Sequence, residues 1–272
     1  MSEGYQDVRQ TGSRARTRVS GVRATRRLAR VLASLAIVTA LGAATSSCSS
    51  SSSTSAASGS GSTAASTAAA ECTAAAGIAS EPIGYHACGD AARNVGVPTY
   101  NAAAAQKTYT VTLQTNRGNI VFTANGKGAP YTVYSFVYLA DKEYFNNTKC
   151  HRLTTSGIFV LQCGDPTGTG SGGPGYAFQD ENLASLGTPV GGSVTYSAGT
   201  VAMANSGPDT NGSQFFLVYK DSPLPPDYTP FGTITQGLSI LLQVAGAGSN
   251  NANSSGDGAP NDPVEIQKAT VQ

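Results

Sequence analysis

The sequence predicts a mainly β fold, an antiparallel barrel or sandwich with two helices. Three observations lead to this prediction. From Lys107 onward the apolar segments are short and bounded by glycine, as strands between tight turns are. Two neighbouring segments alternate apolar and polar residues on either side of a turn. Only two segments repeat their apolar residues with the period of a helix.

The alternating pair predicts a hairpin at the start of this region. Tyr109, Val111 and Leu113 alternate with polar residues, and the turn sequence Asn-Arg-Gly-Asn follows at 116–119. Ile120 and Phe122 then resume the alternation. Because successive side chains of a strand point to opposite faces, the apolar set of both strands can face one core.

The two predicted helices lie at 130–140 and 236–245. The first begins with a proline, which is favoured in the first turn of a helix, and its apolar residues recur at the spacing i, i+3, i+4, i+7. The second carries leucines in the same step. The remaining short apolar segments are predicted to be strands, at 158–162, 193–196, 200–204, 213–218, 230–234 and 264–270.

The amino-terminal part is predicted to be an export leader followed by a tether. Three arginines precede an apolar run at 31–44, and small residues then lead to Cys48. That run is shorter than the roughly 20 residues of a membrane-crossing helix, which favours a signal peptide; an anchoring helix is the alternative. The small residues before the cysteine resemble the lipobox of bacterial lipoproteins, so Cys48 is a candidate lipidation site.

This pattern divides the chain into three parts. Residues 1–47 form the leader, and residues 48–106 form a flexible tether, of which 49–70 are almost wholly Ser, Thr, Ala and Gly. Cys72 and Cys88 are candidates for closing a small loop within the tether. Residues 107–272 form the folded domain. We expect a protein anchored to the outer face of the cell membrane, with full secretion as the alternative.

Charge argues against nucleic acid as a partner. The net charge of +1 includes eight arginines in the first 30 residues, and a chain that begins at Cys48 has nine basic and fourteen acidic residues, a net charge of −5. Such a chain lacks the basic surface that binds phosphate backbones.

Several catalytic motifs can be set aside. Residues 168–173 match the dinucleotide pattern G-x-G-x-x-G, but Pro174 and Gly175 follow where a helix is needed. The chain has two histidines and no G-x-S-x-G sequence, which argues against a serine hydrolase. It has no C-x-x-C pair either, so no metal and no cofactor is expected.

Three stretches together resemble the cyclophilin family of peptidyl-prolyl isomerases. They are CHRLTTSGIFVLQCGDPTGTGSGGPGYAFQDENL at 150–183, MANSGPDTNGSQFF at 203–216 and PFGTITQG at 230–237. The resemblance covers about 107–272 and implies an eight-stranded antiparallel barrel capped by two helices. It also implies an enzyme that isomerises X-Pro peptide bonds in polypeptide substrates. Together with the export leader, this makes exported proteins the expected substrates, and we expect a monomer. A non-catalytic module that binds proline-containing segments is the alternative.

The resemblance assigns the site residue by residue. It implies Arg152 as the catalytic residue and Gln162 as the residue that orients it. The implied substrate-binding residues are Phe159, Val160, Ala204, Asn205, Gln214, Phe216, Leu224 and Tyr228. An alternative role for Arg152 is a structural ion pair with an acid such as Asp165 or Glu181.

Two cysteines flank the strands that carry Arg152 and Gln162. Cys150 and Cys163 are expected to form a cross-strand disulfide, since an exported protein folds in an oxidising compartment.

Overall fold

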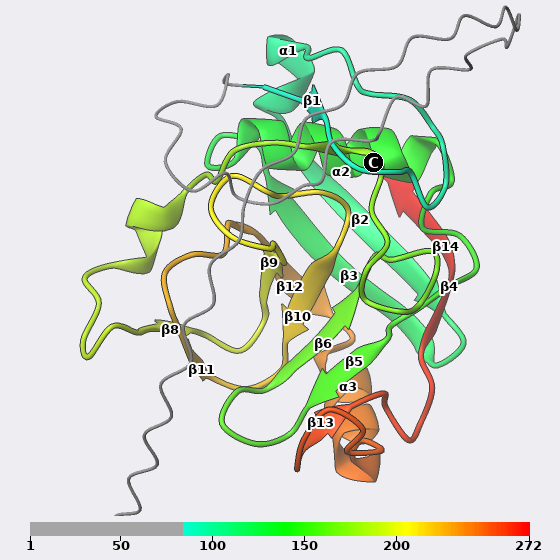
Figure 1. Cartoon of the computed structure of the whole chain (residues 1–272), viewed down its shortest axis with the longest axis vertical. Coiled ribbons are helices and arrows are strands. Elements are labelled where there is room, and N and C mark those ends of the chain that lie inside the picture. Colours follow the sequence, from blue (N-terminus) through cyan, green and yellow to red (C-terminus); the bar gives the residue numbers. More distant parts are fainter. Residues whose placement is uncertain (1–83) are drawn as a thin grey trace, which may run out of the picture. The chain divides into compact units, whose positions relative to one another are not determined.

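A computed structural model describes residues 84–272 (Figure 1). The predicted leader, the lipidation site Cys48, the first part of the tether and Cys72 lie outside the described residues. Within 84–272, no helix is both long enough and apolar enough to span a bilayer.

The described residues are mainly β, as predicted, and most strands belong to one curled antiparallel sheet (Figure 1). Its strand order is β13-β5-β6-β10-β9-β12-β3-β2-β14-β4. The strands are β2 Thr108–Thr115, β3 Gly118–Asn125, β4 Thr148–Lys149, β5 Arg152–Thr154, β6 Val160–Cys163, β9 Thr200–Met203, β10 Phe215–Val218, β12 Pro230–Gln236, β13 Asp257–Gly258 and β14 Glu265–Val271.

Strands near the two opposite ends of this sheet are neighbours along the polypeptide. The short strand β4 pairs with β14 at one end. β5, which follows β4 after two residues, pairs with β6 and with the end strand β13 at the other. One continuous segment therefore connects both ends of the sheet. The eight strands from β5 to β14 in this order equal the number that the resemblance implies, and the two-residue strands β4 and β13 are added at the ends. The segment predicted as a strand at 193–196 forms β8, Val194–Tyr196, outside this sheet.

The predicted hairpin is formed by β2 and β3. Its register runs from Thr108 opposite Asn125 to Thr115 opposite Gly118. Alternate residues of both strands are buried in the main core, which explains the period of two in the sequence.

Two helices pack at the positions that the sequence predicts: α2 at Pro130–Asp141 and α3 at Leu238–Ala247. The second begins two residues later than expected because Gly237 turns the chain with a φ of 90°. A Cβ on Gly237 would lie 2.5 Å from the carbonyl oxygen of Asn119, so only glycine fits there.

The amino end of α2 is capped from a distant loop. Its N-cap residue, Ala129, has no capping side chain, and Glu181 instead accepts hydrogen bonds from the backbone N–H groups of Tyr131 and Thr132 at 3.1 and 2.8 Å. A carboxylate at this end also interacts favourably with the helix dipole.

Residues 84–106, which the sequence assigns to the tether, pack on the body of the domain. β1, His86–Ala87, pairs with β7, Tyr176–Ala177, and a short helix α1 spans Ala102–Ala105. The ring of Tyr85 lies 5.5 to 5.7 Å from those of Tyr131, Tyr176 and Phe178. The described part of the folded body therefore begins before Lys107. The suggested Cys72–Cys88 loop involves a residue outside the described range.

Candidate active site

A row of directly paired residues crosses four neighbouring strands. Arg152 on β5 is opposite Gln162 on β6, Gln162 is opposite Phe216 on β10, and Phe216 is opposite Ala202 on β9. Directly opposed residues of an antiparallel sheet point to the same face. The register therefore places the predicted catalytic pair and a predicted pocket residue side by side.

This row faces away from the main core. On β10, Phe215 and Leu217 belong to the main core, whereas Phe216 and Val218 belong to a second, smaller apolar cluster. The same sheet thus packs the interior with one face and builds the candidate site with the other.

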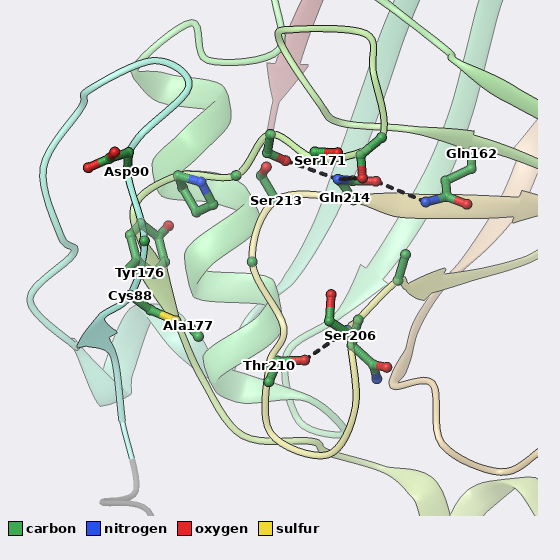
Figure 2. Close-up of a pocket in the computed structure, with 18 residues that line it drawn as sticks. Cys88, Asp90, Gln162, Ser171, Tyr176, Ala177, Ser206, Thr210, Ser213 and Gln214 are labelled. Atoms are coloured by element: carbon green, nitrogen blue, oxygen red, sulfur yellow. Dashed lines mark hydrogen bonds between the residues drawn. The ribbon is translucent and has the colours of Figure 1, made fainter. Parts of the chain in front are cut away.

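The polar half of the site is a series of hydrogen bonds in which each side chain donates to the next, starting from Arg152. Nη1 of Arg152 donates to Oε1 of Gln162 at 3.3 Å. Nε2 of Gln162 donates to Oε1 of Gln214 at 2.9 Å (Figure 2). Nε2 of Gln214 then donates to the carbonyl groups of Gly170 and Gly172. Each amide is held in one orientation because its oxygen accepts and its nitrogen donates.

Asp165 fixes the glycine-rich loop, residues 168–173, whose carbonyl groups accept the last of these hydrogen bonds. Its buried carboxylate accepts hydrogen bonds from the backbone N–H groups of Thr167, Thr169, Gly170 and Gly172, at 2.7 to 3.1 Å. Burial raises the pKa of Asp165, but hydrogen bonds from the Thr167 hydroxyl and from these backbone N–H groups outweigh it and hold the pKa below its usual value.

The apolar half of the site is the second cluster. It brings together the predicted pocket residues Val160, Ala204, Phe216, Leu224 and Tyr228. The rings of Phe216 and Tyr228 meet edge to face with their centroids 5.6 Å apart. Phe216 in this cluster lies in the same row as Arg152, with Gln162 between them.

The cluster also contains Tyr196, which the motifs did not indicate. Its hydroxyl donates to the carbonyl of Tyr228 at 2.8 Å and accepts from the N–H of the same residue at 3.2 Å. It thereby fixes the segment that carries the Tyr228 ring. The only signal in the sequence was an aromatic residue in a short predicted strand, now β8 at Val194–Tyr196, which pairs with β11 at Ser222–Leu224.

Phe159 is not brought into this cluster. It packs against the main core, with its ring 6.0 Å from that of Tyr219 and the Lys220 ammonium 4.4 Å from its centre. The other apolar lining residues that the resemblance implies lie in the second cluster: Val160, Phe216, Leu224 and Tyr228.

Ala204 and Asn205 form one edge of the site, across the cavity from the glycine-rich loop. The Nδ2 group of Asn205 donates to the carbonyl of Asp227 at 2.7 Å, and the N–H of Ala204 donates to the carbonyl of Gln214 at 3.0 Å. These bonds hold the edge that the resemblance assigns to the substrate backbone.

A cavity of about 450 Å³ opens between this edge and the glycine-rich loop (Figure 2). Gln162, Ala204, Asn205 and Gln214 line it from the site. The segment 88–90, from the amino-terminal part of the described chain, forms a further side of the same cavity. The predicted tether thus contributes to the surroundings of the site.

The acidic partner of Arg152 is neither Asp165 nor Glu181. Nε and Nη2 of Arg152 donate to Oδ1 and Oδ2 of Asp257 at 2.9 and 2.7 Å. Asp165 holds the glycine-rich loop and Glu181 caps α2, so both of those carboxylates have other roles. Asp257 lies 105 residues away in the sequence, and no local pattern pointed to it.

Between residues 84 and 272, no three His, Cys, Asp or Glu side chains come together in a way that could hold a metal ion. The groups that the described strands and loops gather at this site are a guanidinium, two amides and an apolar surface.

Comparison with known proteins agrees with this arrangement. Residues 110–271 match the family model described as cyclophilin type peptidyl-prolyl cis-trans isomerase/CLD. The chain belongs to the cyclophilin family. The match covers more than half of the chain and includes every strand from β3 to β14.

Curated relatives include other members of the cyclophilin family. A probable peptidyl-prolyl cis-trans isomerase B of Mycobacterium leprae is 51% identical over 170 residues, which are 59% of this chain and 56% of that protein. The human peptidyl-prolyl cis-trans isomerase-like 1 is 40% identical over 163 residues, which are 58% of this chain and 90% of that protein. The chain thus spans about half the length of the mycobacterial relatives that it matches.

A solved cyclophilin structure from Cryptosporidium parvum has the same fold. It is 29% identical, with a TM-score of 0.51, and the match covers 61% of this chain and 98% of the other. A second structure of that protein was obtained in the presence of the dipeptide Ala-Pro, with a TM-score of 0.50.

This cyclophilin domain has a disulfide behind its site. Cys150 and Cys163 are joined, and both belong to the main core. Cys150 lies two residues before Arg152, and Cys163 directly follows Gln162. The bridge therefore ties together the two strands that carry the predicted catalytic pair.

Proposed function

We propose that the chain is a peptidyl-prolyl cis-trans isomerase that turns X-Pro bonds of polypeptide substrates. The observation that supports this most is the row across β5, β6 and β10, which puts Arg152 on the same face of the sheet as the apolar surface of Phe216, with Gln162 between them. A proline ring on that surface would have its amide nitrogen next to a fixed hydrogen-bond donor.

The chemistry requires no nucleophile. Amide resonance opposes rotation about an X-Pro bond with a barrier of roughly 18–20 kcal/mol. Twisting the bond localises a lone pair on the proline nitrogen, and a donor placed there stabilises the twisted state more than the planar one. In our proposal Arg152 is that donor and Gln162 orients it.

The arginine supplies only part of the effect. A hydrogen bond to a charged group contributes about 1.5–3 kcal/mol, whereas a millionfold acceleration needs roughly 8 kcal/mol. The apolar cluster and the edge at Ala204 and Asn205 are proposed to supply the rest by holding the proline and the flanking backbone while the other side turns.

A change of Arg152 to lysine tests the proposal. Arg152→Lys keeps a positive charge beside Asp257 but lacks the planar fork of donors. We expect kcat/KM for a proline-containing peptide to fall at least about tenfold, with peptide affinity and thermal midpoint nearly retained. Arg117→Lys is the matched control, because Arg117 forms the other ion pair in the described residues, with Asp262.

A refolding assay combined with a peptide-binding measurement separates the enzyme from a non-catalytic binding module. A wild-type protein that binds the peptide but leaves the rate of proline-limited refolding at its uncatalysed value would support the binding module and reject the isomerase.

We further propose that the protein works outside the cytoplasmic membrane as a lipid-anchored monomer, with exported proteins as substrates. The support is the leader pattern that ends at Cys48. Mass spectrometry of the mature amino terminus tests the anchor: a diacylglyceryl-modified Cys48 is expected, and an unmodified residue at this position would reject lipidation. Size-exclusion chromatography tests the monomer.

A further inference from the structure

The guanidinium of Arg152 has five N–H donors, and the structure accounts for three of them. Two go to the carboxylate of Asp257, at 2.9 and 2.7 Å, and one goes to Oε1 of Gln162 at 3.3 Å. One N–H on Nη1 and one on Nη2 remain. Because the guanidinium is planar, contacts on two of its sides determine where these last two donors point.

Asp257 is itself held in place by the sheet. It lies on β13, where its backbone is paired with Thr154 on β5, and Oδ1 also accepts from Nδ2 of Asn253 at 3.0 Å. Its side chain is 19% exposed, compared with 35% for Arg152. The carboxylate is therefore a fixed partner rather than a mobile side chain in solvent.

The ion pair is also electrostatically matched. The hydrogen bond to Arg152 holds the pKa of Asp257 below its usual value, and the hydrogen bond to Asp257 raises the pKa of Arg152. Both groups are charged at neutral pH, so the ion pair is present there.

We propose that Asp257 is a positioning residue for Arg152. It grips one edge of the guanidinium while Gln162 holds another, and together they direct the two remaining N–H groups toward the apolar surface at Phe216. This inference rests on the proposed isomerase function. It assigns a role to the segment that carries β13, which lies outside the motifs recognised in the sequence.

Asp257→Asn tests this role. The amide has almost the same shape but accepts through one oxygen only and carries no charge, so the guanidinium is freer to rotate. We expect kcat to fall about tenfold, because misplaced donors affect the twisted state most, while KM changes by less than about twofold. Asp257→Glu, which keeps both oxygens and the charge, should recover part of kcat.

Asp262→Asn is the matched control, since it removes the acid of the other ion pair in the described residues, Arg117–Asp262. We expect its kcat to equal that of the wild type. An unchanged or increased kcat in Asp257→Asn would overturn the proposal, the latter because the pair would then restrain Arg152 unproductively. A parallel loss of kcat and thermal midpoint with no recovery in Asp257→Glu would also overturn it.

A second readout does not depend on activity. In protein labelled with ¹⁵N, the Arg152 Nε–H resonance should be protected from exchange with water and should lose that protection in Asp257→Asn but not in Asp262→Asn. If the wild type is inactive while this protection is present, the isomerase function fails and the ion pair stands. If the protection is absent from the active wild type, the positioning role fails by itself.

Discussion

At the scale of single residues, the motifs predicted contacts between residues that belong to one continuous stretch of sequence. Arg152 and Gln162 stand on consecutive strands, so one hairpin brings them together. The motifs could not predict Asp257, because its contact with Arg152 depends on the pairing of β13 with β5. The face on which Phe159 packs also depends on tertiary contacts that the sequence does not reveal.

Two adjacent phenylalanines provide a test of the face assignment. Phe216 is 5% exposed in the apolar cluster of the site, and Phe215 is fully buried in the main core. Replacement of either ring by leucine removes packing and should lower the thermal midpoint. Only Phe216→Leu should also reduce kcat/KM for a proline-containing peptide, by several-fold, because only that ring faces the proposed substrate.

The measurement is a comparison of thermal midpoint and kcat/KM in the two variants, with activity normalised to folded protein. Equal kcat/KM for Phe215→Leu and Phe216→Leu would contradict the placement of Phe216 in the site.

At the scale of elements, periodicity was informative where an element has one buried face. It located the β2–β3 hairpin, α2 and α3 to within a few residues. It gave no indication that residues 84–106 are packed, because this segment has little regular structure and is held mainly by single aromatic and polar contacts. Such contacts leave no repeating signal in a sequence.

Arg93 is expected to secure this segment to the domain. Its Nη1 donates to the carbonyl groups of Glu143, Tyr144 and Asn146 at 2.9, 2.7 and 3.0 Å. These residues belong to the loop after α2, where Glu143 has a φ of 56°. Arg93→Ala should reduce the free energy of unfolding by about 1–3 kcal/mol, because it removes charge-assisted hydrogen bonds to partly buried carbonyls.

Chemical denaturation measures this loss, with Lys268→Ala as a control at an exposed basic residue on β14. A stability of Arg93→Ala equal to that of the control would show that the arginine does not hold the segment.

At the scale of the whole molecule, four carboxylates with shifted pKa values form two groups with opposite effects on stability. Hydrogen bonds to Arg152 and to the glycine-rich loop keep the pKa of Asp257 and Asp165, respectively, below the usual 3.8. Burial raises the pKa of Asp180 above 3.8 and that of Glu181 above 4.5, and their hydrogen bonds offset this only in part. The first group favours the folded protein when charged, and the second when protonated.

These signs predict the shape of the stability profile. As pH falls below 6.5, the unfolded state takes up a proton first at His151, whose pKa is lowered by burial, and this lowers the free energy of unfolding. Through the raised pKa values of Asp180 and Glu181 the folded state takes up protons before the unfolded state does, and this contribution raises the free energy of unfolding. The contribution of these two carboxylates should stop rising near their usual pKa values, 3.8 and 4.5. Below 3.8 the unfolded state protonates first at Asp165 and Asp257, and the stability that these charges contribute is lost as pH falls further through their lowered pKa values.

Urea denaturation between about pH 2 and 7 measures this profile, and two variants divide it. Glu181→Gln keeps an acceptor for the N–H groups at the start of α2 but has no proton to bind, so the small rise above the usual pKa of Glu181 should shrink. Asp257→Asn should leave that rise intact and make the acid limb shallower, because one of the two charges with lowered pKa is gone. If Glu181→Gln has the same profile as the wild type between neutral pH and 4.5, the usual pKa of a glutamate, the carboxylate at 181 does not contribute in that range, and its place in the second group would be wrong.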